Sequence, residues 1–459
     1  MNSSATINPQ NPGDPLERRA IRKQLVSLAL PSIADYLLKM MVGVVDTIFV
    51  GRLGPQALAV SGLSWAILFY CYMPMWGMNA GVSAVVARYW GAGEYDKARR
   101  AAGQALMLNL LMPLVVTVML VIWGKDFLRL MGATPNVVEM GGRYLGVLVS
   151  TTIYAGMMFG AQAILKATGD TRSPMLITGI INILNVGLDY CLIYGKFGFP
   201  AHGVIGAAEA SAIVKLLGAF LAVGGLFIGV FKIKVTPSDF ARIDWDMMKR
   251  IIRIGWPTMM ENGFFSLAST AFTWVITSLG TTALAAHTVI LRAESFSYMP
   301  GIGFSIASGI IVGQSIGAGN REKARMAVWE SIKMGSLIMG SMGVVFFFVP
   351  HLVIRIFTDS PEVIAQGVET LRILAIIQPV QGLMFCLLGS LKGAGDTAAT
   401  MKISMVGLWL IRVPGAYVLA VLLGLGVTGA WVAMCLDIAF KAMWLLRRYR
   451  HGGWLDVKI

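Results

Sequence analysis

The sequence predicts an all-α membrane protein of about twelve transmembrane helices, arranged as two related halves of six. First, only 14% of the 459 residues are charged and 56% are hydrophobic, whereas a soluble domain carries roughly 25% charged residues. Second, apolar stretches of about 20 residues, long enough to cross a bilayer, recur along the whole chain. Third, the two halves repeat each other's motifs at one offset.

The apolar stretches place the helices one after another, with no long polar domain between them. The first stretch has the full length of a spanning helix and runs into further helices, so we expect it to be retained rather than removed as a signal peptide. The twelve predicted helices lie near residues 26–50, 60–87, 101–123, 143–165, 174–195, 203–230, 251–278, 284–312, 331–350, 369–391, 401–424 and 426–447.

The distribution of positive charge predicts the orientation of these helices. Most of the 38 Lys and Arg residues lie in the termini and the even-numbered loops, and such an excess marks the cytoplasmic side. Both termini are therefore predicted in the cytoplasm, with the chain crossing the cytoplasmic (inner) membrane several times. The net charge of +14 is then a topology signal and not a sign of nucleic-acid binding. Seven bases fall on the other side: Arg52, Lys125, Arg129, Arg143, Lys196, Arg355 and Arg372.

An internal repeat relates the two halves. Because each half has an even number of helices, both enter the membrane in the same sense, as in transporters that alternate access by rocking. We therefore predict a cytoplasmic tail (1–25), an N-terminal lobe (26–230), a cytoplasmic linker (231–250), a C-terminal lobe (251–447) and a second cytoplasmic tail (448–459). Motifs starting at Pro31, Leu53, Gly91 and Lys166 recur at one constant offset, at Pro257, Leu279, Gly317 and Lys392, and the motif at Gly203 recurs at Gly426 with a slightly shorter offset.

Several functional classes are not indicated. The sequence contains no GxxxxGK[ST] motif, so any transport must use an ion gradient or the gradient of the substrate itself. The four cysteines and four histidines form no metal-ligand pattern, and we expect neither a metal, an organic cofactor nor enzyme chemistry. The Gly-Ala-Gly and Gly-Asp-Thr loops are predicted to be helix caps and not phosphate sites.

Ionisable residues inside predicted spans are the strongest functional candidates, because a charge at the bilayer centre costs at least about 2.5–3.5 kcal/mol. The first helix carries Asp35, Lys39 and Asp46, which lie within about 40° of one another around a helix and form one stripe. Asp35 and Lys39 are one turn apart and are expected to pair. Asp46 is then the less compensated acid and the better candidate for binding an ion.

The fifth and sixth helices supply further polar groups. Asn182, Asn185 and Asp189 lie on one face of the fifth helix, and their oxygens could hold Na⁺ or take part in a proton relay. Function is favoured for Asp189. For the two asparagines, and for Ser211 on the sixth helix, ion binding and ordinary interhelical hydrogen bonding stay equally open. Glu209 and Lys215, also on the sixth helix, are expected to pair with each other.

The second half lacks this cluster. The repeat places Phe272, Ile411 and Gly415 where the first half has Asp46, Asn185 and Asp189, and only Asp35 has an acidic counterpart, Glu261. Ion coupling is therefore expected mainly in the N-terminal lobe, and Arg292 and Glu294 in the eighth helix are interpreted as packing or gating groups.

Several stretches resemble the multidrug and toxic compound extrusion (MATE) family, over essentially the whole chain. They are Val45-Asp46-Thr47-Ile48-Phe49-Val50-Gly51-Arg52-Leu53-Gly54, Gly303-Phe304-Ser305-Ile306-Ala307, Val312-Gly313-Gln314-Ser315-Ile316-Gly317-Ala318 and the paired Gly-Asp-Thr loops. The resemblance implies a V-shaped fold of two six-helix bundles. It also implies antiport of organic, mainly cationic, drugs against H⁺ or Na⁺.

The resemblance also implies roles for individual residues. Asp46 matches the helix-one acid of the family, and Asn185 with Asp189 matches the helix-five pair of its DinF-like branch, where Ser211 replaces the usual Thr. Gln162 takes a helix-four amide position. Glu261 matches the helix-seven acid of the NorM-like members, but the amides of Gln378 and Gln381 stand where those members carry an acid in helix ten. The resemblance therefore does not imply an ion site in the C-terminal half.

Two other classes compete with this interpretation. A flippase for lipid-linked sugars or lipids has a related architecture, but it needs a cationic centre, and bases within the helices are few. A structural membrane protein would show no ion-dependent response. The many Met residues and aromatic side chains suit a cleft for varied organic cations, but they could equally face lipid. We expect a monomer in contact with membrane lipid, with small organic cations as partners and no nucleic acid.

Overall fold

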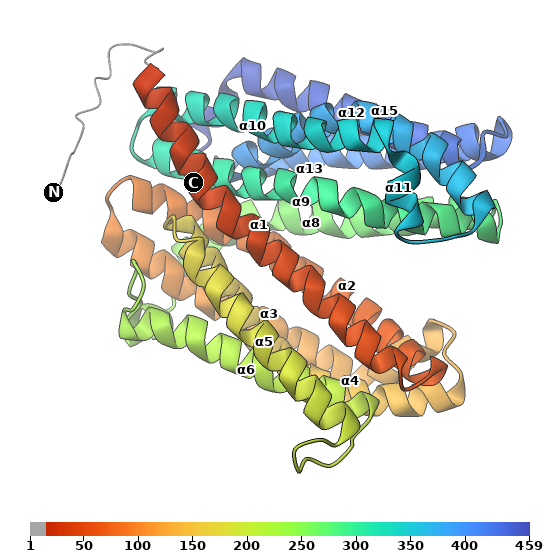
Figure 1. The fold of residues 1–459 in the computed structure, drawn as a ribbon. Helices are drawn as coiled ribbons and strands as arrows, with labels where there is room; N and C mark the ends of the chain where they lie inside the picture. The colour runs from red at the N-terminus through yellow and green to blue at the C-terminus, as the bar shows by residue number, and fades with distance from the viewer. Residues whose placement is uncertain (1–14) are drawn as a thin grey trace. The chain divides into compact units, whose positions relative to one another are not determined.

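The computed structural model describes residues 15–459, and within them the chain is all-helical. Ten of the helices in this range are long and apolar enough to cross a membrane. Two more long helices are α1 (Pro15–Gly51) and α8 (Trp245–Thr277), with 37 and 33 residues. Figure 1 follows the chain through these helices. Each of the twelve predicted segments coincides with a helix, which confirms the predicted fold class.

The remaining long helices follow in the predicted order. They are α2 (Pro55–Gly91), α3 (Tyr95–Leu130), α4 (Pro135–Ala167), α5 (Arg172–Tyr194), α6 (Val204–Ile228), α9 (Thr281–Gly317), α10 (Arg321–Phe348), α12 (Pro361–Gly393), the composite helix from α13 to η2 (397–422), and α15 (Gly426–His451). The short α11 (Pro350–Arg355) continues from α10, and the short η3 (Gly453–Asp456) follows α15.

Most helices extend beyond the apolar segments that predicted them. The start of α1 differs most from the prediction, because the helix begins at Pro15 and not near residue 26. Proline is favoured in the first turn of a helix, where its missing N–H has no partner to lose. Hydropathy locates only the part of a helix in contact with lipid, so it misses polar helical ends. Positions 1–14 of the predicted N-terminal tail lie outside the described residues.

The segment predicted as a linker, 231–250, packs on α3. It contains the short helix α7 (Pro237–Ala241), whose start is fixed by reciprocal hydrogen bonds between Thr236 and Asp239. The side-chain amide of Gln104 on α3 donates to the backbone carbonyls of Asp239, at 2.9 Å, and Arg242, at 2.7 Å. These bonds attach the linker to the helices that precede it.

Packing divides the chain into two compact units, and the division falls inside α1 and α8. The N-terminal unit comprises residues 34–90 and 94–263, with Ile459. The C-terminal unit comprises residues 15–33, 91–93 and 264–458. The first part of α1 therefore packs with the second half of the sequence, and the first part of α8 packs with the first half.

The internal repeat accounts for this exchange. In the N-terminal unit, a Cβ on Gly77 of α2 would lie 2.4 Å from the Cα of Met259 on α8. In the C-terminal unit, a Cβ on Gly303 of α9 would lie 2.3 Å from Cγ1 of Ile33 on α1. In the repeat, Gly303 is the counterpart of Gly77 and Met259 is the counterpart of Ile33, so one close helix crossing is built twice. Glycine permits this approach because it has no side chain.

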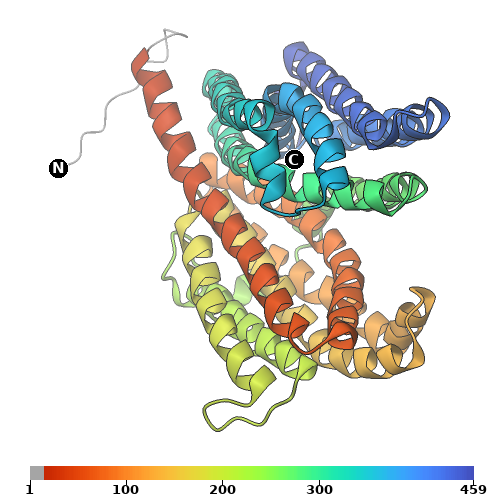
Figure 2. The ribbon, with the colours of Figure 1, turned by 45° about the vertical axis from the view of Figure 1, so that its right-hand side comes forward.

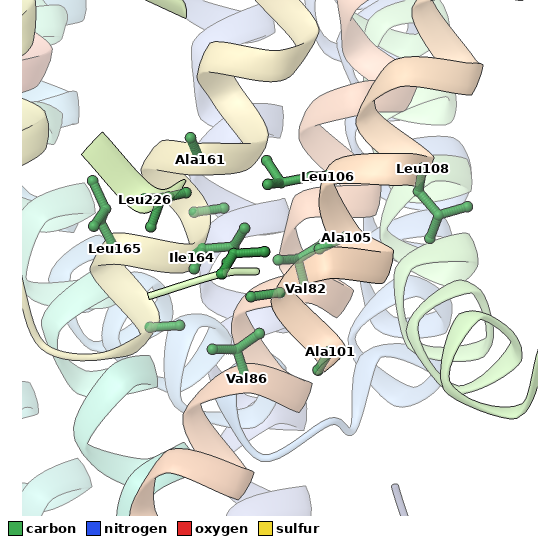
Figure 3. Close-up of a cluster of buried hydrophobic side chains, with 14 of the residues drawn as sticks. Val82, Val86, Ala101, Ala105, Leu106, Leu108, Ala161, Ile164, Leu165 and Leu226 are labelled. Carbon is green, nitrogen blue, oxygen red and sulfur yellow. The ribbon is translucent and has the colours of Figure 1, made fainter. Parts of the chain in front are cut away.

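Small and branched apolar side chains form the core of the N-terminal unit. Ala101 and Ala105 on α3 and Ala161 on α4 are fully buried, and Val82 and Ile164 fill the space between their helices (Figure 3). α4 packs on both α3 and α6, and α6 packs on α5. This packing holds α4, α5 and α6 in place around the polar residues described below.

The C-terminal unit is built on α9, α10, α12 and α15, which pack against one another. The composite helix consists of α13 (Thr397–Val406), the π-helical η1 (Gly407–Arg412), α14 (Val413–Ala416) and the π-helical η2 (Tyr417–Leu422). Pro414 lies between the two π stretches, and a proline removes one helical hydrogen bond and crowds the preceding turn, which a wider turn relieves. α15 packs along this helix, as the dark blue pair in Figure 2 shows.

Candidate ion and substrate site

Asp46 and Asp189 face each other in the N-terminal unit. Asp46 lies on α1 and Asp189 on α5, and their carboxyl groups interact directly. Asp189 is fully buried, and neither of its carboxyl oxygens has a hydrogen-bond partner among the described residues. Two ionised carboxylates can only accept hydrogen bonds, so they bond to each other only when a proton is bound between them. We call these two residues the carboxyl pair.

The carboxyl pair is surrounded by groups from three helices. Lys215 on α6 interacts electrostatically with Asp46, and its ammonium lies 5.8 Å from the ring centre of Tyr72. Tyr144 on α4 is buried and interacts with both acids. The pair therefore has one base and one phenol beside it, within a largely apolar region.

Asn185 lies near the pair, one turn before Asp189 on α5. It is 2% exposed, and its amide nitrogen has no partner among the described residues. Asn182 is held differently, because its amide donates to the backbone carbonyl of Leu38 on α1 at 2.8 Å. Ser211 on α6 is half-buried and lies one turn before Lys215. Asn182 thus links two helices, whereas the role of Ser211 stays a prediction.

A second group of ionisable side chains surrounds Asp35, and we call it the lysine cluster: Asp35, Lys39, Gln162, Lys166 and Thr178. The ammonium groups of Lys39 and Lys166 donate to the same oxygen of Asp35, at 3.0 and 2.8 Å. Thr178 donates to the other oxygen at 2.6 Å. Lys39 also donates to the side-chain oxygen of Gln162 at 3.1 Å. The predicted pairing of Asp35 with Lys39 is present, but Lys166 was not foreseen as its third member.

The prediction that Glu209 pairs with Lys215 is wrong. Glu209 is hydrogen-bonded to Nδ1 of His202 at 2.6 Å, just before the start of α6. Positions six residues apart differ by about 240° around a helix, so Glu209 and Lys215 point to different sides. Lys215 instead faces Asp46 and Tyr72.

Glu261, the acid that the resemblance assigns to helix seven, is buried on α8. It lies in the part of α8 that packs with the N-terminal unit. The sequence places this residue in the second half, but packing places it in the same unit as the carboxyl pair.

The C-terminal unit contains a charged group that we call the C-terminal ion cluster: Glu294, Arg412, Asp437 and Lys441. The sequence analysis singled out only Glu294 of these residues and did not connect it with the others. Arg412 and Lys441 both donate to one oxygen of Asp437, each at 2.8 Å. Glu294 accepts a hydrogen bond of 2.9 Å from Gln381 and interacts electrostatically with Arg412. Asp437 and Lys441 have the same four-residue spacing as Asp35 and Lys39, and this spacing inside an apolar helix could have revealed them.

The oxygens near the carboxyl pair are the candidate ligands for a cation. Within residues 15–459 no group of three or more His, Cys, Asp and Glu side chains is arranged to hold a metal ion. A Na⁺ ion would have the carboxylates of Asp46 and Asp189 and the amide oxygen of Asn185. The positive charge of Lys215 beside Asp46 opposes the binding of any further cation there, a proton included.

These features define a class of protein: a polytopic membrane protein with ionisable groups buried inside its helical bundle, which is typical of secondary transporters. A family model described as MatE matches residues 31–191 and 257–418, once in each half. The chain therefore belongs to the MatE family, the multidrug and toxic compound extrusion transporters, which are not enzymes.

Individual relatives and solved structures agree with this assignment. The chain is 32% identical over 440 residues, 95% of its length and 93% of the relative's, to a probable multidrug resistance protein NorM of Thermotoga maritima. It has the fold of a MATE protein solved in a bent conformation, at a TM-score of 0.88, 22% identity and coverage of 96% and 98%. A straight conformation matches at the same TM-score of 0.88, with 23% identity and coverage of 95% and 97%. The DinF-like branch stays a prediction.

Proposed function

We propose that this protein exports organic, mainly cationic, compounds across the cytoplasmic membrane in exchange for H⁺, with the carboxyl pair as the coupling site. The observation that carries the proposal is the direct interaction of Asp46 with Asp189 between α1 and α5. Export of drugs is supported by the relatives named as multidrug resistance proteins.

The chemistry of the pair supports an exchange. Two adjacent carboxylates in an apolar region repel each other unless a cation is bound between them. A proton binds as an O–H group shared between the two oxygens, whereas an organic cation binds when both carboxylates are ionised. Because both ligands use the same charges, each displaces the other. Coupling then follows from competition at one site.

The surroundings of the pair favour a proton over Na⁺. A proton needs only the two carboxyl oxygens, but a Na⁺ ion needs several more oxygen ligands. The gradient that drives export is then a proton gradient, to which a membrane potential of 100 mV adds about 2.3 kcal/mol per charge.

Helix α1 connects the pair to the rest of the molecule. Pro31 lies inside α1, close to the point between Ile33 and Ala34 where packing passes from one unit to the other. A proline weakens the helical hydrogen bonds around it, so α1 can bend there. Proton binding at Asp46, in the second part of α1, would favour one bend of the helix over another and so change access to the site.

Transport in liposomes tests the proposal. We expect purified protein to move ethidium when a pH gradient is imposed, and much less when only a Na⁺ gradient is imposed. Asp46→Asn and Asp189→Asn should each stop this movement, because an amide cannot exchange a proton. The measurement is the rate of ethidium fluorescence change after each gradient is applied.

The matched control is Asp126→Asn, which removes an exposed aspartate that pairs with Arg129 on α3. This variant should transport at the wild-type rate. Transport by Asp46→Asn at the wild-type rate would contradict the role of the pair. A response to Na⁺ alone would assign Na⁺ as the coupling ion, and failure of both gradients to move any cation would bring the lipid flippase forward.

A further inference from the structure

A groove of about 360 Å³ lies in the C-terminal unit, between the start of α13 and the end of α15. Ala398, Ala399 and Lys402 of α13 line one wall, and Trp444 and Arg448 of α15 line the other. The two alanines are small, so they leave space between the helices. Both helix ends are predicted on the cytoplasmic side, so we expect the groove where the membrane meets the cytoplasm.

Two bases give this groove a positive charge. Lys402 is exposed, and the side chain of Arg448 is 32% exposed. Nε of Arg448 donates to Oδ2 of the buried Asp396 at 2.7 Å, which uses one of the five N–H donors of the guanidinium. Asp396 therefore neutralises one charge and holds Arg448 in place. The groove keeps one net positive charge and further N–H donors.

An aromatic face leads from the groove toward the apolar part of α15. Phe440, Trp444 and Arg448 follow one another at four-residue spacing, so they lie on one side of the helix. The rings of Phe440 and Trp444 meet edge to face, with their centres 5.4 Å apart. Tryptophan is favoured where a membrane meets water. This side of α15 changes from apolar to basic along its length, which matches a molecule with an apolar tail and a charged head.

The counterpart positions in the N-terminal half are not basic. The repeat places Leu176, Leu221 and Gly225 where the C-terminal half has the lysine, the tryptophan and the arginine of the groove. A Cβ on Gly225 would lie 2.3 Å from Cε2 of Phe231, so a side chain of the protein itself occupies the space beside this glycine. The fold of the repeat therefore does not require the two bases or the open space.

We propose that this groove binds an anionic phospholipid of the cytoplasmic leaflet, with the phosphate between Lys402 and Arg448 and an acyl chain along Trp444 and Phe440. Arginine binds phosphate through paired N–H groups, and the lysine adds a charge from the opposite wall. Basic pockets between transmembrane helices on the cytoplasmic side suit anionic headgroups.

The same features disfavour other phosphates. A zwitterionic phospholipid carries its own ammonium group, which cancels the attraction of the net positive charge. Free phosphate has no tail for the aromatic face of α15. A bound anionic lipid would contact α13 and α15 together and so hold the ends of these two helices against each other.

Binding of labelled lipids tests the assignment. Purified full-length protein in detergent is titrated into phosphatidylglycerol or phosphatidylcholine that carries a fluorophore on an acyl chain, and fluorescence anisotropy gives each affinity. We expect the wild type to bind phosphatidylglycerol about ten times more tightly than phosphatidylcholine, and Lys402→Gln to reduce this ratio about fivefold, the loss expected for one base near an anionic lipid. Trp444→Leu should weaken the binding of both lipids and leave their ratio unchanged.

Two further variants separate recognition from general charge and from folding. Arg447→Gln is the matched control, because it removes an exposed base of α15 that does not line the groove, and it should keep the preference for phosphatidylglycerol. Arg448→Gln should reduce the preference, but it also breaks the pair with Asp396. Lys402→Gln leaves that pair intact, so the result does not depend on the folding of Arg448→Gln.

The proposal is overturned if the wild type binds both lipids equally or if Lys402→Gln keeps the full preference. It is also overturned if Arg447→Gln reduces the preference as much as Lys402→Gln, because the whole basic face would then attract the lipid. Displacement of labelled phosphatidylglycerol by an excess of inorganic phosphate would assign the groove to free phosphate instead. None of these results depends on the proposed export function, whose failure is seen as absent ethidium transport.

Discussion

The lysine cluster and the C-terminal ion cluster share one sequence pattern but differ in the balance of acids and bases. In each, an aspartate is paired with a lysine four residues later on one helix and with a second base from a neighbouring helix. In the C-terminal ion cluster, Glu294 also interacts electrostatically with Arg412 and so provides a second acid. Asp35 remains the one acid of the lysine cluster.

This difference shows how to distinguish a structural ion cluster from a candidate binding site. Arg412 and Lys441 are 14% and 9% exposed, and the C-terminal ion cluster contains two acids beside these two bases. Lys39 is more exposed, and its cluster is not balanced. The same sequence pattern therefore holds helices together in one unit and leaves a positive charge available in the other.

The largest effect is expected from removing the acid of the balanced cluster. Asp437→Asn would leave Arg412 and Lys441 buried beside a neutral amide, and breaking a buried ion pair in this way costs about 3–5 kcal/mol. The measurement is the shift in the detergent-unfolding midpoint. If the free energy of unfolding falls by less than about 1 kcal/mol, Glu294 must pair with both bases in place of Asp437. The cluster would then be less rigid than its geometry indicates.

A smaller effect is expected from the corresponding change in the lysine cluster. Asp35→Asn should lower the free energy of unfolding by about 1–3 kcal/mol, because Lys39 is partly exposed and can be hydrated. The same unfolding assay compares the two variants directly. If Asp35→Asn proves as destabilising as Asp437→Asn, the two clusters do not differ in the way that their exposure suggests.

Removing one base from each cluster sharpens the comparison. Arg412→Met would leave two acids with one lysine and should destabilise the protein by about 2–4 kcal/mol. Lys166→Met would remove the excess charge of the lysine cluster and should change stability by less than about 1 kcal/mol. Unfolding midpoints of the two variants, measured side by side, test this asymmetry. Equal losses of stability in the two variants would mean that the lysine cluster carries no excess positive charge.

The smallest effect is expected from a neutral hydrogen bond in the same region. Asn182→Ala removes the bond to the carbonyl of Leu38 and should cost about 0.6 kcal/mol, the average for interhelical hydrogen bonds in membranes. Ethidium transport should continue at the wild-type rate. A transport defect in this variant would show that Asn182 takes part in ion binding after all.

Helix order and the strongest candidates were predictable from the sequence because hydropathy and helical spacing are local properties. Asp35 with Lys39, and Asp46 on the same stripe, follow from their spacing alone. The pairing of Glu209 with Lys215 failed because it ignored helical phase. Asp437 was overlooked although it lies four residues before Lys441, the spacing that identified Asp35 with Lys39. The starts of α1 and α8 were placed too late, since hydropathy does not register polar helical turns.

By itself, the sequence determined the twelve helices, the repeat and the acids that had to face inward, because each depends on residues close together along the chain or on one constant offset. Only the tertiary structure decided that α1 and α8 each contribute to both units. It also decided that Asp46 meets Asp189, that Lys166 joins Asp35, and that Arg412 lies between Glu294 and Asp437. These contacts join side chains from different helices, and helix packing, not the pattern along any one helix, sets their distances.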